Sequence, residues 1–266
     1  MKHLVFFVFL VVNTQFVFTQ EPVTLGEKFR FTSEILAEER EYWVYLPKEY
    51  NKKVGKKYPV LYLLDGDRNF ISLVAINQNR QSKAFIIIAV LNTDRSRDFT
   101  PTNSLKRIKG YHPTSGGAEH FHRFLATEFR KHIDANYRTS GRNILLGHSF
   151  GGLFAMYSFL NHIESFDGYI ALDPSLWWDN EALLKDYYQR WTTINAGGKQ
   201  LYIAQSGSKD SGDEMLKDPL SSFCHDLLKG QKRDGLNYKF EKFEHESHGN
   251  IVLPASLNAI SFLLDE

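Results

Sequence analysis

The chain has 266 residues, of which 42% are hydrophobic and 24% are charged, and its formal net charge is +1. These values are typical of a soluble globular protein that can bury a sizeable core, and the balanced charge argues against nucleic acid or an anionic membrane surface as a partner. Because Cys224 is the single cysteine, an intramolecular disulfide is excluded and stability must come from the core.

The first twenty residues, 1–20, are predicted to be a signal peptide. Lys2 supplies a positive start, residues 4–12 form a continuous apolar run, and Thr19 is a small residue near a possible cleavage point. The run is shorter than the ~20 apolar residues that a bilayer span needs. We therefore expect an exported protein, periplasmic or secreted, without stable membrane insertion after cleavage. A short membrane anchor or a buried strand is the alternative.

Residues 21–266 are predicted to form one domain, because no repeat, low-complexity tract or linker divides them. Strands are expected, in chain order, at 28–33, 41–46, 59–64, 84–91, 143–146, 169–172, 201–204 and 238–243. Helices are expected at 117–137, 151–161, 181–191, 216–229 and 254–264. Apolar strands that alternate with helices predict an α/β domain with a mostly parallel central sheet and helices on both faces. In such sheets reactive groups gather in loops beyond the carboxyl ends of the strands.

A G-x-S-x-G motif follows the strand expected at 143–146. It reads Gly147-His148-Ser149-Phe150-Gly151 and leads directly into a predicted helix. This context is typical of a nucleophile elbow, a strained strand-to-helix turn that exposes the serine hydroxyl. The alternative is a tight turn without chemistry. Ser149 is therefore the predicted nucleophile.

The base that activates such a hydroxyl is expected after the last strand. His245 and His248 both follow the strand at 238–243, and His248 is preferred because Gly249 gives it a mobile, closely packed loop. The spacing of the two histidines does not match the zinc motif H-E-x-x-H. No metal site and no cofactor are predicted.

The carboxylate that orients the base must lie between the serine and the histidine in chain order. Asp210 is the first candidate, because it lies in a glycine-bounded loop just beyond the strand at 201–204. Asp173, directly after the strand at 169–172, is the second, and Asp213 is the third.

An oxyanion hole needs N–H donors placed in advance, each worth roughly 3 kcal/mol of barrier. The amide of Phe150, directly after the nucleophile, is one predicted donor. The amide of Asp67, in the loop after the strand at 59–64, is the other.

Four further residues are candidates for substrate binding. Arg95 and Arg97 follow the strand that ends at Leu91, and an arginine there could bind a carboxylate or catecholate-type oxygen. The alternative is that ion pairs with neighbouring aspartates merely hold their own loop. Trp177 and Trp178 could form an aromatic wall for an acyl or aryl group, although core packing is equally consistent for one of them.

Together these segments resemble the Putative esterase family of α/β-hydrolases. That family includes siderophore trilactone esterases, feruloyl and acetyl-xylan esterases, S-formylglutathione hydrolase and the antigen 85-like mycolyltransferases. The resemblance covers nearly all of residues 30–266 and is carried by the segments 58–67, 92–101, 147–152, 174–179 and 247–249.

The resemblance implies an α/β-hydrolase fold, with Ser149 and His248 as the catalytic pair and the amides of Phe150 and Asp67 as the oxyanion hole. Asp173 departs from the family pattern, which often has serine before the proline. The expected function is a serine carboxylic-ester hydrolase that forms an acyl-enzyme with a small-molecule ester, such as a siderophore-like lactone or a small acyl or aryl ester. An acyltransferase with the same residues and a non-catalytic binding protein of the same fold are the alternatives. Oligomeric state is not predicted.

Overall fold

The computed structural model describes residues 24–52, 54–80, 83–103, 112–190, 195–207, 220, 223–224 and 235–265. The predicted signal peptide at 1–20 lies outside the described residues, as do the acid candidates Asp210 and Asp213 and most of the helix expected at 216–229.

Eight strands form one sheet in the order β1-β2-β4-β3-β5-β6-β7-β8. The strands are β1 (Glu27–Ser33), β2 (Glu38–Tyr45), β3 (Tyr58–Leu63), β4 (Ile86–Val90), β5 (Thr139–His148), β6 (Gly168–Leu172), β7 (Gln200–Ser206) and β8 (Asn237–Phe243). The pairings β1–β2 and β2–β4 are antiparallel, and all others are parallel. The predicted mostly parallel sheet is therefore confirmed.

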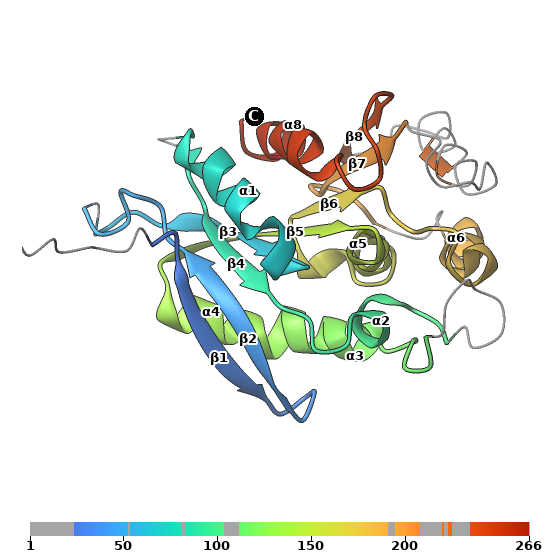
Figure 1. Cartoon of the computed structure of the whole chain (residues 1–266), viewed down its shortest axis with the longest axis horizontal. Helices are drawn as coiled ribbons and strands as arrows, with labels where there is room; N and C mark the ends of the chain where they lie inside the picture. The colour runs from blue at the N-terminus through green and yellow to red at the C-terminus, as the bar shows by residue number, and fades with distance from the viewer. Residues whose placement is uncertain are drawn as a thin grey trace, which may run out of the picture.

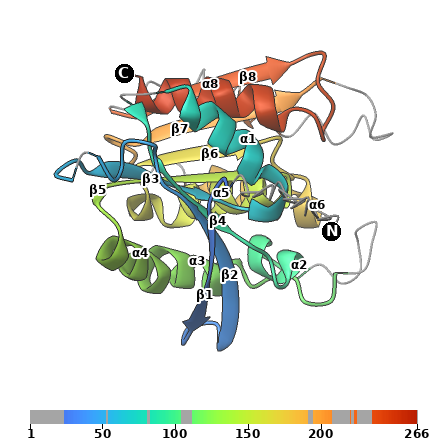
Figure 2. The same cartoon turned by 60° about the vertical axis from the view of Figure 1, so that its left-hand side comes forward.

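Helices cover both faces of this sheet, as predicted (Figures 1 and 2). One face carries α1 (Gly66–Gln78) and α8 (Val252–Leu264). The other carries α3 (Ala118–Arg123), the π-helical segment η2 (Phe124–Phe129), α4 (Arg130–Asn136) and α5 (Phe150–Asn161). The remaining helical segments are α2 (Arg95–Phe99), η3 (Ile163–Ser165) and α6 (Trp178–Arg190).

The two helical layers enclose separate apolar cores, and the strands contribute to both. On β3, Val60 and Tyr62 belong to one core, whereas Leu61 and Leu63 belong to the other. This division follows from the alternation of side chains along a strand. It explains why the central strands read as continuous apolar runs, with no polar face.

Several helical segments differ from the sequence prediction, and one of them is α2, which forms where a loop was expected. The helix expected at 117–137 forms as α3, η2 and α4 in succession, with a π-helical middle. The segment after β3, expected to be a loop at the oxyanion hole, is instead the start of α1. The signal for α1 was present in the sequence, because its buried residues Phe70, Leu73, Val74 and Asn77 recur at spacings of three and four.

In the part of the chain that the structure describes, none of the helices has the length and apolar character needed to span a bilayer.

A buried histidine on α3 leads to the first testable prediction, on stability. His122 is 4% exposed, and its ring stacks on His162 with the ring centroids 4.1 Å apart. Burial, with the nearby His162 as a second cause, lowers the pKa of His122 to about 4. In the unfolded chain an imidazole titrates near ~6.5. The unfolded state therefore binds a proton that the native state does not, and stability falls as the pH drops from ~6.5 towards 4.

We expect His122→Gln to reduce this decrease in stability at acid pH. Between pH 7 and pH 5 the wild-type protein should lose about 2 kcal/mol more of its unfolding free energy than the variant does. Urea unfolding at the two pH values measures this difference. The exposed His120 on the same helix provides the control, His120→Gln, which should behave as wild type. Equal pH losses in the wild-type protein and in His122→Gln would contradict the prediction.

Candidate active site

The predicted strand-to-helix turn is present, and Ser149 lies between β5 and α5. Its backbone has φ 59° and ψ −117°, a strained conformation for a residue with a side chain. The flanking glycines make the turn possible: a Cβ on Gly147 would lie 2.1 Å from the carbonyl oxygen of Gly151. The Ser149 N–H donates to the carbonyl of Leu172, at the end of β6. The elbow is thus held at the carboxyl edge of the sheet.

His248 lies in the loop between β8 and α8, and its imidazole contacts Asp173. Nδ1 donates to Asp173 Oδ2 at 2.7 Å. Asp173 directly follows β6, has φ 42°, and also accepts from Ser206, from the backbone N–H at 3.0 Å and from the hydroxyl at 2.6 Å. The carboxylate beside the base is therefore the second candidate from the sequence, whereas the preferred Asp210 lies outside the described residues. His245 is exposed, and the structure brings His248, not His245, to the acid.

Hydrogen bonding keeps Asp173 ionised despite its burial. Burial acts to raise the pKa of the carboxyl, but the hydrogen bonds from His248 and Ser206 outweigh it and hold the pKa below its usual range. The anion accepts the Nδ1 proton of His248 and so selects the tautomer in which Nε2 carries a free lone pair. Nε2 is the atom that can take a proton from a hydroxyl.

Ser149 and His248 do not share a hydrogen bond, although the structure describes both. Ser149 Oγ instead lies 3.3 Å from Oγ of Ser175, a residue only 3% exposed. The two sides of the site are nevertheless adjacent, because His148, the neighbour of the serine, donates from Nε2 to the main-chain carbonyl of His248 at 2.7 Å. Catalytic hydrogen bonds are often long in the absence of substrate, so this geometry is compatible with proton transfer from Ser149 to His248.

Both predicted oxyanion donors lie at helix N-termini. Phe150 is the first residue of α5, and Asp67 is the second residue of α1. Amides in the first turn of a helix have no acceptor within the helix, and the helix dipole favours negative charge there. The two turns are in contact, since a Cβ on Gly151 would lie 3.3 Å from Oδ2 of Asp65. The arrangement suits an anion between them.

Arg95 holds these two turns together. Its guanidinium donates from Nε and Nη2 to the two carboxylate oxygens of Asp65, at 2.7 and 2.9 Å, and also from Nη2 to the carbonyl of His148 at 3.2 Å. Asp65 is 2% exposed, has φ 52°, and also accepts from Asn92 at 2.7 Å. The guanidinium of Arg95 therefore already has hydrogen-bond partners within the protein at this site.

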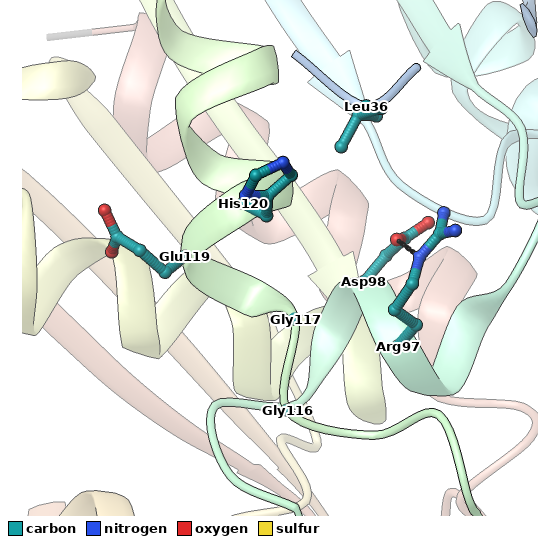
Figure 3. A pocket seen from close by; sticks show the side chains of 7 residues that line it. All are labelled: Leu36, Arg97, Asp98, Gly116, Gly117, Glu119 and His120. Carbon is teal, nitrogen blue, oxygen red and sulfur yellow. Dashed lines mark hydrogen bonds and ion pairs between the residues drawn. The ribbon is translucent and has the colours of Figure 1, made fainter. Parts of the chain in front are cut away.

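Arg97 lines a pocket of about 500 Å³ beside the start of α3 (Figure 3). Its guanidinium pairs with Glu38 on β2, at 2.7 and 3.1 Å, and with the neighbouring Asp98 at 2.8 Å. The pair with Asp98 matches the alternative reading of the sequence, in which ion pairs with neighbouring aspartates hold the segment, whereas the pair with Glu38 joins this segment to β2. Direct substrate binding by Arg95 or Arg97 stays an untested prediction that the contacts do not favour.

The two tryptophans have different environments. Trp178 is 1% exposed and donates from Nε1 to the hydroxyl and carbonyl oxygens of Thr102, so it is a core residue and cannot form a substrate wall. Trp177 is half-buried, with its ring centroid 6.1 Å from that of Phe150. Of the predicted pair, Trp177 alone offers an aromatic surface next to the nucleophile.

Four residues at the site were missed by the sequence analysis. Asp65 and His148 occur in segments that carried the family resemblance, but nothing in the sequence indicates their partners. Ser175, which also lies in such a segment, contacts Ser149, and Ser206 contacts Asp173; the sequence indicates neither contact.

The Arg95 clamp leads to a prediction about catalysis. Arg95→Lys keeps the charge but loses the planar guanidinium, whose N–H groups donate to both Asp65 and the His148 carbonyl. We expect kcat for p-nitrophenyl acetate to fall about 10- to 100-fold with little change in KM, because the oxyanion donors move relative to each other. Arg97→Lys, the same change two residues along α2, should leave kcat within about threefold of wild type. Equal effects of the two substitutions would contradict the clamp.

Comparison with known proteins identifies the family. The family profile described as Putative esterase matches residues 33–222. The chain belongs to the Putative esterase family. It is similar to the crystal structure of an IroE-like serine hydrolase from Shewanella oneidensis, with 31% identity and a TM-score of 0.84 over 90% of this chain and 80% of that one.

Curated relatives of this esterase include the ferri-bacillibactin esterase BesA of Bacillus subtilis (strain 168), 28% identical over 85% of this chain and 86% of that protein. The siderophore enterobactin esterase of Emericella nidulans is 27% identical over 79% of this chain and 83% of that protein. Family and fold together make this chain an ester hydrolase with the α/β-hydrolase fold.

Proposed function

We propose that this esterase cleaves siderophore-type esters through an acyl-enzyme, with Ser149 as nucleophile, His248 as general base and Asp173 as its orienting acid. The observation that carries the assignment is the 2.7 Å hydrogen bond from His248 Nδ1 to Asp173, next to a serine with elbow geometry. This hydrogen bond fixes the tautomer of the base and places a negative charge beside it.

In the first half-reaction Ser149 Oγ attacks the ester carbonyl carbon and its proton passes to His248 Nε2. The negative charge on the carbonyl oxygen is stabilised by the amides of Phe150 and Asp67. The C–O bond to the alcohol then breaks, and the His248 proton goes to the departing oxygen. A water molecule repeats the sequence on the acyl-enzyme and releases the acid. Asp173 stabilises the imidazolium in both halves.

Two observations support the siderophore class. Two relatives, each matched over more than three quarters of its length, are named as esterases of bacillibactin and of a siderophore, enterobactin. Beside the nucleophile, the half-buried ring of Trp177 packs near Phe150 and offers a surface that suits an aryl group.

A panel of esters tests this substrate class. It contains a cyclic trilactone of aryl-acylated serine, a feruloyl ester, an acetylated sugar and p-nitrophenyl acetate. We expect kcat/KM for the trilactone to exceed that for p-nitrophenyl acetate by about 100-fold or more, because binding energy from the distant aryl groups contributes to the transition state. Turnover of p-nitrophenyl acetate with none of the trilactone would exclude the substrate class and leave the esterase assignment intact. Addition of a competing alcohol tests for acyl transfer, and the free acid is the expected main product.

We also propose export to the periplasm or the medium, supported by the positive start and apolar run of residues 1–20. N-terminal sequencing of the exported protein should find a start near Gln20. Retention of Met1 in a cytoplasmic protein would contradict it.

A further inference from the structure

His148, the residue before the nucleophile, makes a side-chain contact that the mechanism does not use. Its Nε2 lies 2.7 Å from the main-chain carbonyl oxygen of His248, and the two imidazole centroids are 4.5 Å apart. Because a carbonyl oxygen can only accept, Nε2 of His148 carries the proton and is the donor.

This hydrogen bond fixes the main chain of His248, the proposed base. The His248 side chain is 53% exposed and lies on a loop of mostly exposed residues between β8 and α8. Asp173 anchors the ring at Nδ1, and the His148 bond anchors the backbone of the same residue. Two anchors at opposite ends of the residue determine where Nε2 can lie.

His148 is itself rigidly placed. It is the last residue of β5, its carbonyl accepts from Arg95 at 3.2 Å, and Ser149 follows it in the elbow. A single side chain therefore spans the gap between the nucleophile's backbone and the base's backbone. A rigid link of this kind is what a reaction needs when misplacement by ~1 Å costs about 100-fold in rate.

We propose that His148 is a positioning residue, which sets the distance between Ser149 and His248 by donating Nε2–H to the His248 carbonyl. The inference rests on the proposed function, since it assigns a role within the same site.

The charge state of His148 suits this role. Partial burial, with the neighbouring His248 as a second cause, lowers the pKa of His148 to about 4. His148 is thus neutral at working pH, and it adds no positive charge beside the imidazolium that forms on His248 during the reaction.

Two substitutions separate the hydrogen bond from the ring contact. His148→Phe keeps an aromatic ring against His248 but has no donor, whereas His148→Gln keeps an N–H donor at similar reach without the ring. With p-nitrophenyl acetate we expect His148→Phe to lower kcat about 10-fold at unchanged KM, the worth of one hydrogen bond. His148→Gln should restore kcat to within about threefold of wild type.

A double-variant cycle tests whether His148 acts through the base. In a His248→Ala background, His148→Phe should cause no further loss, because nothing remains to be positioned. The acid limb of the pH profile of kcat/KM should keep its position in His148→Phe, since the titrating base is unchanged. Additive losses, a shifted acid limb, or a His148→Gln variant as slow as His148→Phe would overturn the inference.

Hydrogen–deuterium exchange of peptides covering residues 244–252 tests the contact without reference to activity. Exchange should be faster in His148→Phe than in the wild-type protein and in His148→Gln. A wild-type protein that hydrolyses no ester would refute the proposed function, and the exchange rates would still test the contact between His148 and the His248 carbonyl. An active wild-type protein whose His148→Phe variant shows wild-type kcat and exchange would refute the inference alone.

Discussion

Ser149→Ala should lower kcat for p-nitrophenyl acetate by about 10⁴- to 10⁶-fold. Without Oγ no acyl-enzyme forms, and the remaining rate enhancement comes from the oxyanion amides and substrate binding. Steady-state kinetics measure the loss, and a fluorophosphonate probe should label the wild-type peptide that contains Ser149 but not the variant.

The neighbouring Ser175 provides a matched control. Its hydroxyl lies 3.3 Å from that of Ser149, but the proposed mechanism gives it no proton to transfer. Ser175→Ala should therefore lower kcat by less than about 10-fold, in line with the loss of one neutral hydrogen bond. Wild-type turnover by Ser149→Ala would refute the assignment of the nucleophile.

Asp173→Asn should lower kcat by about 10³- to 10⁴-fold with little change in the melting temperature. The amide keeps the size of the carboxylate, but it lacks the charge that stabilises the imidazolium and no longer selects the tautomer of His248. Because the hydrogen bonds of Asp173 hold its pKa below the usual range, the wild-type carboxylate stays ionised at any pH above ~4. Its protonation should not limit activity there.

Asp210→Asn is the control for this prediction, since Asp210 was the preferred acid on sequence grounds. It should retain kcat within about threefold of wild type, because His248 Nδ1 already has Asp173 as its partner. A larger loss for Asp210→Asn than for Asp173→Asn would return the acid role to the loop after β7.

The choice of acid shows the limit of reasoning from sequence. Asp173 and Asp210 follow neighbouring parallel strands, β6 and β7, whose carboxyl ends lie at the same edge of the sheet. Chain order and loop composition favoured Asp210. The structure instead turns Asp173 towards His248 through a left-handed backbone conformation and the two bonds from Ser206. Neither feature has a signature in the local sequence.

Arg95 and Arg97 show the same limit. They are two residues apart on α2, yet one pairs with Asp65 beside the nucleophile and the other with Glu38 on β2. Their position after a strand predicted proximity to the catalytic edge. Asp65 and Glu38 lie 30 and 59 residues away from their arginines along the chain, so these pairings depend on how distant segments pack.

By itself, the sequence determined the parallel sheet, the elbow around Ser149 and the loop that carries His248, because hydrophobic periodicity and glycine spacing act over a few adjacent residues. Only the tertiary structure decided that Asp173 meets His248 across 75 positions of the chain, that Trp178 is core, and that His148 contacts the base loop. Such pairings depend on how separate strands and loops pack against each other, and side chains distant along the chain leave no mark on one another's local sequence.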